Sequence, residues 1–527
     1  MYKNGSIKRL LVYVLMFIFI VPVAVGCSNQ TEKTTKEGQI DTYVASDGAG
    51  DCGFPSPYGH HAYGTGYLRM SFIFDTLVWK DDKDIIPALA ESWEYLKDEN
   101  AYLFKLHKDV TWHDGTAFSA KDVVFTFNYT KSYPYQYVDN KIVSKAEAVD
   151  EHTVKLYLDK PFASFLTFVA GVQPILPEHI WKNVSSPDKY QEKDASIGTG
   201  PYKLVDYNKE QGSYLFESND KYYQGKPKVK QLKFVKISKE MAAAALQQKQ
   251  VDFATVPPET EKDLASKGFE VLVDTGTIVR QLMINHQKEP FSNTEFRQAL
   301  SYAIDRQAIV DTAQRGYATV GSPGLVPPNN PWYNANLPQY SCDPDKSREI
   351  LSKLGYIKKD NFFEKDGKTL TLNLLYTPES ERNAEMVKKQ LENAGIKINL
   401  RSLESAMLAS TIVNWDFDLA VHGSGGLCAD PTFFQRAVVS DAPWSARYFK
   451  NKSIIDLFDQ QAQEMDKTKR KNLVGQIQEL YAQDVPSIPL YYQNTYYVHN
   501  NKLNLYFTIE GMFIGCPIPL NKMSFIK

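Results

Sequence analysis

Three histidines in two short stretches are the residues of this chain whose types and spacing could bind a metal chelate. His60 and His61 are adjacent, and Tyr63 is one of several tyrosines around them. His422 opens a second stretch, which reads His-Gly-Ser-Gly-Gly-Leu-Cys-Ala-Asp-Pro. Imidazoles suit nickel, copper or zinc. If the fold brings the two stretches together, His60, His61 and His422 would coordinate a metal that arrives with a small chelator.

The same spacing allows a plainer role for these histidines. Adjacent residues of a strand point to opposite faces, and the chain contains no HxxxH or HExxH pattern. His60 and His61 would then be an ordinary solvated pair. We expect no resident metal ion and no cofactor.

His113 and Asp114 are the pair that would suit acid–base catalysis. Gly115 follows them, however, and an Asp-Gly step after an aromatic residue is a common turn between two strands. Neither a GxSxG serine motif nor a paired metal motif accompanies the histidine. A secreted hydrolase is therefore disfavoured, and we expect a protein that is not an enzyme.

Cys27 ends an apolar run and predicts export. Residues 10–25 carry no charge and follow two basic residues, which is typical of a signal peptide. The junction Ala-Val-Gly-Cys resembles the bacterial lipobox, so residues 1–27 are predicted to be a lipoprotein signal peptide with lipidation at Cys27. The alternatives are a signal peptide with an incidental cysteine, or an N-terminus that stays in the membrane. We expect an extracytoplasmic protein, lipid-anchored at the cell membrane.

Composition limits the partners and the size of the folded part. A net charge of −2 over 527 residues removes the electrostatic case for a nucleic-acid partner. About 500 residues follow Cys27, too many for a single core, so two or more lobes are expected. The aromatic share of 13% is high, and such residues often line ligand pockets. The cysteines after Cys27 show no CxxC spacing, which argues against a thiolate zinc site.

Short runs typical of strands alternate with helical runs, which indicates an α/β fold. Residues 28–39 are polar without an apolar period and predict a flexible tether, so the folded part begins near Ile40. Strands are predicted over 153–158, 232–237, 369–376, 397–400 and 416–421. Helices are predicted over 294–313, 345–354 and 380–393, the first with a capping box of Ser292 and Glu295.

Four stretches stand in a fixed order along the chain. They are Pro-Ala-Leu-Ala-Glu-Ser-Trp-Glu from residue 87, continuing to His-Asp-Gly-Thr from 113 and Ala-Lys-Asp-Val-Val-Phe from 120; Gly-Thr-Gly-Pro-Tyr from 198; Phe-Arg-Gln-Ala-Leu-Ser-Tyr-Ala-Ile-Asp-Arg from 296; and Asp-Pro-Asp-Lys from 343. In order and spacing they resemble the family 5 extracellular solute-binding proteins over nearly the whole mature chain. That family includes oligopeptide, dipeptide and nickel-complex receptors of ABC importers.

The resemblance implies a periplasmic-binding-protein-like fold of type II, cluster C, with two lobes and a hinged ligand cleft. It implies a first lobe of residues 40–277 plus 488–527, with an inserted subdomain near 62–185, and a second lobe of residues 278–487. Two strands would join the lobes as a hinge. The Gly-Thr-Gly-Pro segment from Gly198 would cross between the lobes, because it lacks the Lys-Ser/Thr of a phosphate-binding loop.

The resemblance also implies ligand residues in the glycine-rich stretch. In oligopeptide receptors a Cys-Ala-Asp sequence of the second lobe supplies an aspartate that pairs with the peptide's α-ammonium group. Asp430 matches that aspartate and Cys428 the cysteine, whereas Leu427 departs from the aromatic residue of such receptors. Gly425 and Gly426 would let a ligand approach the backbone closely. The alternative for Asp430 is an Asp-Pro turn that caps a helix.

Trp415 and Arg447 complete the predicted ligand-binding set as a wall and a clamp, since both are near the glycine-rich stretch in sequence. We therefore expect the substrate-binding lipoprotein of an ABC importer, which captures an extracellular peptide between its lobes and delivers it to the membrane permease. The alternatives are a receptor for nickel or another metal chelate, with His60, His61, Tyr63 and His422 at the site, and a peptide sensor that does not import. We expect a monomer.

Overall fold

The computed structural model describes residues 39–62, 64–139, 141–427, 430–508 and 518–526. The predicted signal peptide with Cys27, the tether up to residue 38, Tyr63 and Cys428 lie outside these residues. What the sequence predicts for them stays a prediction.

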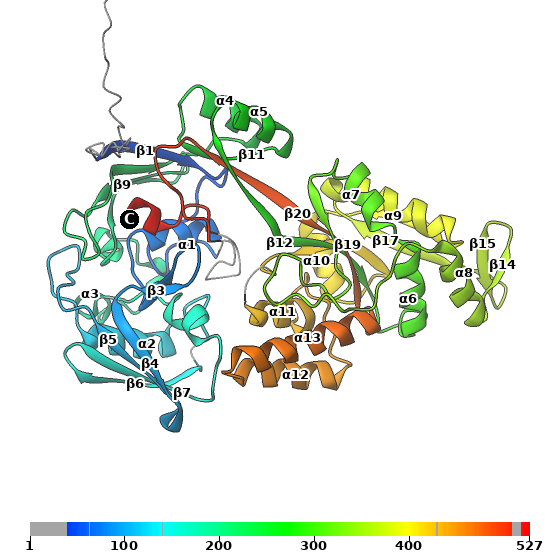
Figure 1. Ribbon diagram of the computed structural model, residues 1–527, viewed down its shortest axis with the longest axis horizontal. Helices are drawn as coiled ribbons and strands as arrows, with labels where there is room; N and C mark the ends of the chain where they lie inside the picture. Colours follow the sequence, from blue (N-terminus) through cyan, green and yellow to red (C-terminus); the bar gives the residue numbers. More distant parts are fainter. Residues whose placement is uncertain (1–38, 63, 140, 428–429, 509–517, 527) are drawn as a thin grey trace, which may run out of the picture. The chain divides into compact units, whose positions relative to one another are not determined.

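One large mixed sheet of eleven strands runs through the described chain (Figure 1). Its strands are β1 (Ile40–Ser46), β8 (Tyr202–Asn208), β9 (Ser213–Ser218), β10 (Val229–Phe234), β11 (Phe253–Val256), β12 (Glu270–Ile284), β13 (Ala318–Val320), β17 (Thr371–Tyr376), β18 (Lys397–Ser402), β19 (Leu419–Ser424) and β20 (Ser487–His499). They follow the order β18-β17-β19-β12-β20-β11-β1-β10-β9-β8, and β13 pairs with β20.

Smaller sheets and helices surround this sheet. The remaining strands are β2 (Val78–Lys80) with β3 (Ile85–Pro87); β4 (Ala90–Leu96), β5 (Ala101–Leu106), β7 (Thr153–Leu158) and β6 (Val143–Asp150); and β14 (Ile357–Lys359), β15 (Phe362–Lys365) and β16 (Lys368–Thr369). The helices are α1 (Gly64–Ser71), α2 (Ala120–Ser132), α3 (Glu178–Trp181), α4 (Lys239–Gln247), α5 (Glu261–Ser266), α6 (Thr294–Ala303), α7 (Arg306–Thr312), α8 (Pro344–Lys353), α9 (Glu381–Asn393), α10 (Ser405–Val413), α11 (Pro431–Val439), α12 (Lys452–Gln463) and α13 (Lys467–Asp484). Short helical turns are η1 (Lys97–Glu99), η2 (Leu166–Ala170), η3 (Pro187–Lys189), η4 (Lys193–Ser196), η5 (Pro258–Thr260), η6 (Pro378–Ser380) and η7 (Lys522–Phe525).

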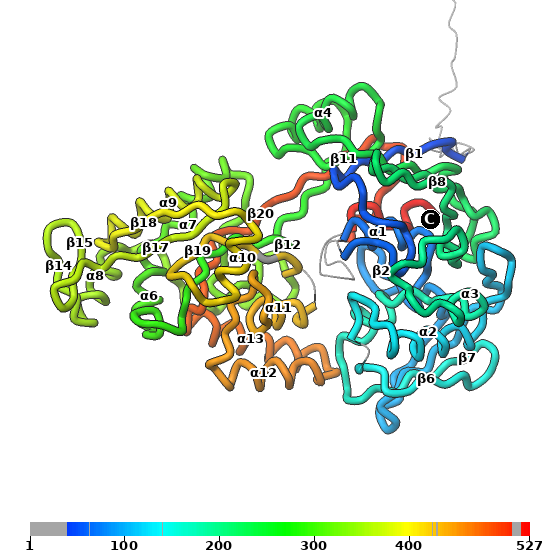
Figure 2. Tube along the Cα trace, turned by 180° about the vertical axis from the view of Figure 1, so that it is seen from behind, coloured from blue at the N-terminus to red at the C-terminus, as the bar shows by residue number. Residues whose placement is uncertain are grey.

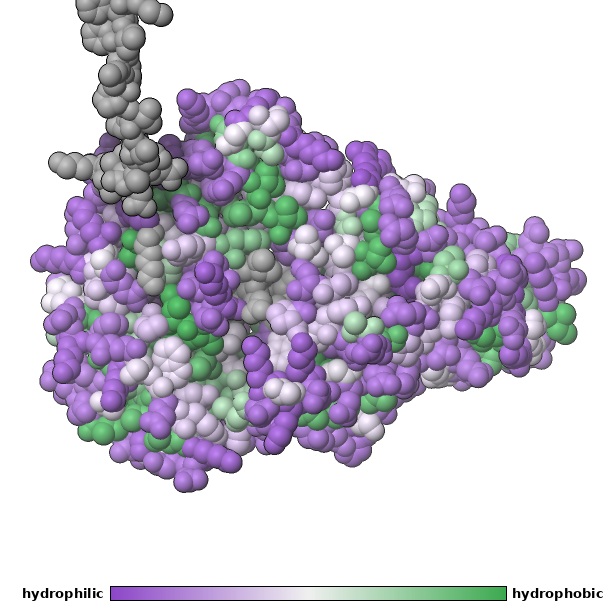
Figure 3. All heavy atoms as spheres, viewed as in Figure 1, coloured by the Kyte–Doolittle hydropathy of each residue, from purple (hydrophilic) through white to green (hydrophobic). Residues whose placement is uncertain are grey.

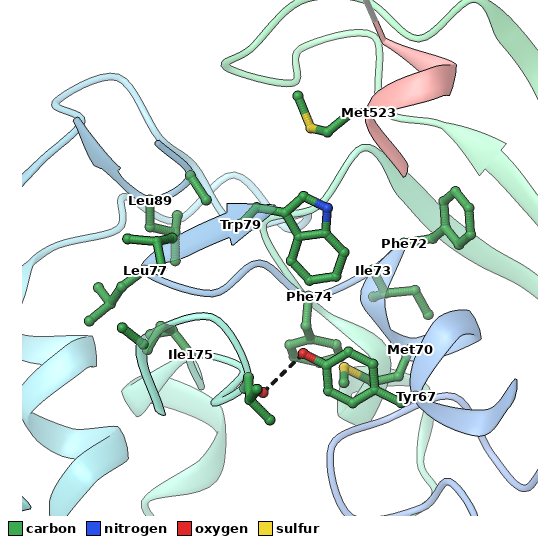
Figure 4. Packing of buried hydrophobic residues seen from close by; sticks show 14 of the residues in the cluster. Tyr67, Met70, Phe72, Ile73, Phe74, Leu77, Trp79, Leu89, Ile175 and Met523 are labelled. Carbon is green, nitrogen blue, oxygen red and sulfur yellow. Dashed lines mark hydrogen bonds between the residues drawn. The ribbon is translucent and has the colours of Figure 1, made fainter. Parts of the chain in front are cut away.

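Buried apolar side chains form separate clusters, and these define two lobes. The largest cluster gathers side chains of residues 43–253 and 503–526, and the part of the chain around it is called the first lobe here. Trp79, Phe74 and Tyr67 pack together inside this cluster (Figure 4). Three other clusters gather side chains between residues 279 and 492, and they define the second lobe. The predicted two-lobed α/β fold is thus confirmed.

β12 and β20 run side by side and contribute to the cores of both lobes (Figure 2). Asp274 pairs with Thr495 and Ile278 pairs with Gln493, so β12 carries a bulge between these positions. One carboxylate oxygen of Asp274 fills the bulge by accepting hydrogen bonds from the Gly276 and Thr277 amides, both at 3.2 Å, and from the Thr277 hydroxyl at 2.8 Å. A bulge bends a strand locally, which makes this the expected pivot of the strand pair.

The predicted helix over 294–313 is two helices, α6 and α7. Ile304 is extended between them, and the Asp305 carboxylate accepts a hydrogen bond from the Ala308 amide and so begins α7. An aspartate that bonds to nearby backbone competes with a continuous helix. The predicted capping box is also wrong, because Asn293 caps α6 by accepting from the Phe296 amide.

Two further predictions need correction. The strand predicted at 416–421 is β19, three residues later, because the Trp415 and Asp416 amides still bond to carbonyls of α10. The segment from Gly198 does not cross between the lobes. It packs within the first lobe, where a Cβ at Gly198 would lie 2.0 Å from the carbonyl oxygen of Ile73.

Hydrophilic side chains cover much of the face in Figure 3, with hydrophobic ones in small groups among them. None of the helices in the described part of the chain is both long enough and apolar enough to cross a membrane.

Candidate functional site

The three parallel strands of the second lobe end at one edge of the sheet. β17 is parallel to both β18 and β19. In open α/β sheets, ligands bind at the carboxyl ends of strands, because the loops that follow them surround a crevice there. A cavity of about 460 Å³ lies at this edge, and it is lined by Arg280, Gln314, Thr377, Glu379, Ser380, Ser405, Val421, His422, Tyr491 and Gln493. We take this cavity as the candidate ligand site.

Arg280 gives the cavity a positive charge. It is half-buried and pairs across the strands with Gly423. A Cβ at Gly423 would lie 2.9 Å from Nη1 of Arg280 and 2.7 Å from the carbonyl oxygen of Val279, so the absent side chain leaves room for the guanidinium. Within the described residues, no hydrogen bond or ion pair is assigned to the side chain of Arg280. Its five donors are therefore available to an anionic group.

Glu379 gives the cavity a negative charge. It lies exposed in η6, directly after β17. Hydrogen bonds from its own backbone amide and from the Thr377 hydroxyl lower the pKa of Glu379, and the Arg280 charge lowers the pKa further. The cavity thus presents a carboxylate and a guanidinium, which together suit a ligand that carries both charges.

His422 is the residue of the predicted ligand set that lines this cavity. Its Nδ1 lies 2.9 Å from the carbonyl oxygen of Gly423. Burial lowers the pKa of His422, and the nearby Arg280 charge lowers the pKa as well. The ring is therefore neutral at pH 7.

A hydrogen-bonded chain stiffens the cavity wall beside Arg280, which pairs with Tyr491 across β12 and β20. The Asn383 amide nitrogen donates to the Tyr491 hydroxyl at 3.1 Å, and the Gln314 amide nitrogen donates to Asn383 Oδ1 at 3.0 Å. Buried polar groups that satisfy one another in this way hold a fixed shape. Gln314 and Tyr491 therefore line the cavity as a preformed surface.

Asp430 is occupied by protein groups. It caps α11 by accepting from the Thr432 amide, and Arg470 binds it at 2.7 and 2.8 Å. Burial alone would raise the pKa of Asp430, yet the charge and hydrogen bonds of Arg470 hold it below its ordinary value. The helix-capping role weighed from the sequence is therefore the one observed. A role as ammonium partner would require this ion pair to break.

Trp415 and Arg447 close the end of α10. The Arg447 guanidinium donates to the carbonyl oxygens of Ile412 and Val413 and lies 4.8 Å from the centre of the Trp415 ring. Both residues have left-handed backbone conformations, with φ values of 58° and 52°. Cations at a helix C-terminus stabilise its free carbonyls, so this contact explains the pair without a ligand.

Gly425, Gly426 and Leu427 connect the sheet edge to the bulge of β12. Gly426 has a positive φ of 87°, which glycine adopts without strain. The Leu427 amide donates to the Thr277 carbonyl at 3.4 Å. The Asn330 amide nitrogen donates to the Leu427 carbonyl at 2.8 Å. The glycines thus lie beside both the cavity-bearing strand β19 and the expected pivot.

His60 and His61 have different environments. His60 is 4% exposed, its Nε2 lies 3.2 Å from the Tyr135 hydroxyl, and its ring stacks on Tyr137 with centres 5.8 Å apart. Burial lowers its pKa to about 4. His61 is exposed. Across the described residues, no three histidine, cysteine, aspartate or glutamate side chains are grouped so as to hold a metal ion.

His113 and Asp114 border a larger cavity, about 770 Å³, within the first lobe. The turn predicted there is confirmed, since the Gly115 amide bonds to the Trp112 carbonyl at 2.9 Å. Nε2 of His113 lies 2.9 Å from the Gly200 carbonyl, and burial lowers the His113 pKa to about 4. The imidazole is therefore a structural group, and this cavity has no parallel strand ends around it.

Arg280 and Glu379 are not among the residues predicted from the sequence. Arg280 is the single charge in the stretch Ile-Val-Arg-Gln-Leu-Met-Ile, where a lone cation is expensive to bury without purpose. Glu379 follows a predicted strand and precedes a predicted helix. The rule that ligands bind at strand carboxyl ends could have selected it.

Comparisons with known proteins identify the family and agree with the two-lobed fold. Residues 84–446 match the family model of bacterial extracellular solute-binding proteins, family 5. The dipeptide-binding protein of Escherichia coli strain K12 is 27% identical over 435 residues, which cover 77% of this chain and 80% of that protein. The oligopeptide-binding protein AppA of Bacillus subtilis strain 168 is 27% identical over 523 residues, covering 94% and 95%. The crystal structure of NikA from Brucella suis in complex with Fe(III)-EDTA superposes with a TM-score of 0.78 at 22% identity, covering 91% and 99%.

Proposed function

The chain belongs to the family 5 bacterial extracellular solute-binding proteins, and from that premise we propose that it captures a peptide outside the cell and delivers it to an ABC permease. Proteins of this family bind solutes for ABC importers and are not enzymes. We further propose that lipidation at Cys27 holds the protein at the outer face of the membrane, as the sequence predicts. Peptide, permease and anchor together describe an import receptor.

The opposite charges of Arg280 and Glu379 in one cavity carry the peptide proposal. A peptide has an ammonium group at one end and a carboxylate at the other, whatever its side chains. Arg280 would pair with the carboxylate and Glu379 with the ammonium group. The names of the dipeptide- and oligopeptide-binding relatives point to the same class of cargo.

Binding would act by shifting an equilibrium between open and closed lobes. The residues that line the cavity belong to the second lobe and to the strands that join the lobes. A ligand held there would raise the population of the closed state through the contacts it adds with the first lobe. The permease would then recognise the closed form. The glycine-rich segment, bonded to Thr277 at the bulge of β12, would connect the cavity to the pivot.

A metal chelate is the second candidate cargo. The neutral imidazole of His422 in the cavity favours it, since a neutral ring nitrogen can bind a metal. The structure of NikA with Fe(III)-EDTA shows that a protein of this fold can hold a chelate. A single histidine would then complete the coordination of a metal whose other ligands come from the chelator.

A thermal-shift assay of the protein from residue 28 onward would separate these cargoes. The ligands are pools of di- to octapeptides, and Ni²⁺ with and without histidine. A ligand at 100 times its Kd stabilises the folded state by about 2.7 kcal/mol, which raises the melting temperature measurably. We expect peptides to stabilise the protein and Arg280→Gln or Glu379→Gln to abolish that shift.

The matched controls are Arg382→Gln and Glu381→Gln, which change exposed residues at the start of α9 outside the cavity lining. They should keep the peptide shift. Stabilisation by nickel–histidine alone, lost in His422→Ala, would replace the peptide proposal with chelate uptake. Genes for a permease and an ATPase beside this one would support import over sensing.

A further inference from the structure

Ser164 of the first lobe reaches an ion pair of the second lobe. We propose that Ser164 and the Asp430–Arg470 pair form a latch that holds the two lobes together in the absence of bound solute. The inference rests on the two-lobed fold and not on the identity of the cargo.

The three side chains form one hydrogen-bonded unit. The Ser164 hydroxyl donates to Asp430 Oδ1 at 2.6 Å. Arg470 Nη2 donates to both the Ser164 oxygen, at 2.8 Å, and Asp430 Oδ1, at 2.7 Å. Arg470 Nη1 donates to Asp430 Oδ2 at 2.8 Å. Ser164 is fully buried, so the contact excludes water.

Each half of the latch is fixed within its own lobe. The Ser164 carbonyl accepts from the Phe168 amide at 2.8 Å, and the next residue, Phe165, is buried in the first-lobe cluster. On the other side, Arg470 Nε donates to the Gln461 carbonyl at 3.1 Å, and its guanidinium lies 5.1 Å from the centre of the Trp332 ring. Both halves are thus positioned before they meet.

Separating Ser164 from the ion pair requires little free energy, because Asp430 and Arg470 stay paired with each other. Asp430 and Arg470 belong to the same lobe and keep their bidentate contact when Ser164 leaves. No buried charge loses its partner, which is the situation that makes broken ion pairs expensive. The hydrogen bonds of the Ser164 hydroxyl are exchanged for bonds to water, and each such exchange changes an equilibrium about three- to tenfold.

The contact surface between the lobes around Ser164, called the seam here, has few other interactions. This is what a reversible contact requires. The Ala163 amide donates to the Ala462 carbonyl at 2.8 Å, and the rings of Phe168 and Phe433 lie 4.6 Å apart. Beside them is a cavity of about 620 Å³, with walls from both lobes that include Phe162 and Arg436. A permanent interface would be packed like a core, without such a void.

The test uses residues 39–527, which contain every hydrophobic cluster of the described chain, after unfolding and refolding to remove bound solute. Ser164→Leu places a bulky side chain in the latch, and Ser185→Leu makes the same change at an exposed position. Small-angle X-ray scattering reports the radius of gyration. Amide hydrogen exchange at Ala163 reports the hydrogen bond across the seam.

We expect wild type and Ser185→Leu to share a smaller radius of gyration than Ser164→Leu. The Ala163 amide should exchange about three- to tenfold faster in Ser164→Ala and faster still in Ser164→Leu. Equal exchange at Ala163 in wild type and Ser164→Ala would overturn the latch, as would equal scattering of wild type and a folded Ser164→Leu. If Ser164→Leu does not fold, the Ser164→Ala exchange decides alone.

Discussion

An arginine fits against β19 only because residue 423 has no side chain. The Cδ atom of Arg280 would lie 3.0 Å from a Cβ at Gly423, and the Val279 carbonyl would be closer still at 2.7 Å. A Cβ at Gly425, two residues later, would have the Thr277 carbonyl oxygen as its nearest neighbour, at 4.0 Å. Position 423 therefore has no room for a side chain, whereas position 425 has room for one.

Gly423→Ala should displace Arg280 and weaken peptide binding at least tenfold. Overpacking of this kind also costs about 1–3 kcal/mol of unfolding free energy. Gly425→Ala should change the free energy of unfolding by no more than about 0.5 kcal/mol. Titration calorimetry with a bound peptide and urea unfolding measure the two effects. Equal behaviour of the two variants would refute the steric role of Gly423.

A buried ion pair anchors the C-terminal segment to the first lobe. Lys522 and Asp75 are 1% and 0% exposed, and Lys522 also lies 4.3 Å from the centre of the Trp79 ring. Lys522→Met should lower the free energy of unfolding by about 3–5 kcal/mol, because Asp75 would stay buried without a cation. Lys230→Met, which breaks an exposed pair with Asp41, should leave the free energy of unfolding nearly unchanged, because solvent screens that pair. Urea denaturation of both variants tests the difference.

Residue types alone could predict part of the site. His422 can be selected from the sequence because imidazole chemistry is visible in a letter code, and it does line the cavity. A local motif selects Asp430, but its charged partner, Arg470, is 40 residues away in sequence. No local pattern shows that a carboxylate will be neutralised by a distant guanidinium. Arg280 and Glu379 likewise come together only through the order of the strands.

At the scale of elements, the bulge of β12 is held by a single carboxylate. Asp274 receives three hydrogen bonds from the bulged residues and is 2% exposed. The neighbouring loop adds a contact, since the Asn329 amide nitrogen donates to the Thr275 hydroxyl at 2.8 Å. The conformation of the pivot therefore depends on Asp274.

Asp274→Ala should free the bulge and lower the free energy of unfolding by about 1–3 kcal/mol, because the Gly276 and Thr277 amides lose their acceptor. Amide hydrogen exchange at Thr277 should accelerate with it. Asp274→Asn keeps an oxygen in place and should preserve most of the protection. Unchanged exchange in Asp274→Ala would show that the bulge is set by backbone pairing alone.

Elements were predictable where one periodicity dominated. The strand at 153–158 is β7, and the helix at 380–393 differs from α9 by one residue. The helix predicted at 294–313 is too long, since its apolar spacing continues across Asp305 while the aspartate begins a new helix. Apolar spacing reports the buried face, and a capping side chain ends the element regardless of it. Neither apolar spacing nor capping side chains predict the order of the strands in the sheet.

At the scale of the whole molecule, several buried histidines link folding to proton binding. Burial lowers the pKa values of His60, His113 and His286 to about 4 each. In the unfolded chain their pKa values return to about 6.5, so the unfolded state binds more protons between pH 6.5 and 4. Stability is then lost as the pH falls through this window, by on the order of 3 kcal/mol per histidine at most.

The urea midpoint should therefore fall steadily from pH 6.5 to pH 4. His286→Gln should flatten this dependence, because it removes one of the rings that are neutral in the folded state and protonated in the unfolded chain. Burial raises the pKa values of Asp122 and Asp274, so the folded state binds protons at these carboxyls more readily than the unfolded chain. They therefore offset part of the loss of stability at the lower end of the pH range. A midpoint independent of pH above 5 would contradict the assignment of these rings as neutral and buried.

The overall fold was the most predictable feature, because its evidence is spread over the chain. The four stretches quoted from the sequence fall in different elements, and the matched family region spans residues 84–446. A resemblance distributed in this way constrains topology even when each motif is weak. Cargo depends instead on a few side chains at one edge, and it stays a proposal.

The continuity of the large sheet through β12 and β20 has a mechanical consequence. Paired strands resist sliding along each other, since every backbone hydrogen bond of the ladder would have to break at once. They bend easily at a bulge, where bonds are already missing. The two strands should therefore bend together easily at the bulge and resist sliding along each other. Lobe motion would follow a single path, and a solute would tune its amplitude rather than its direction.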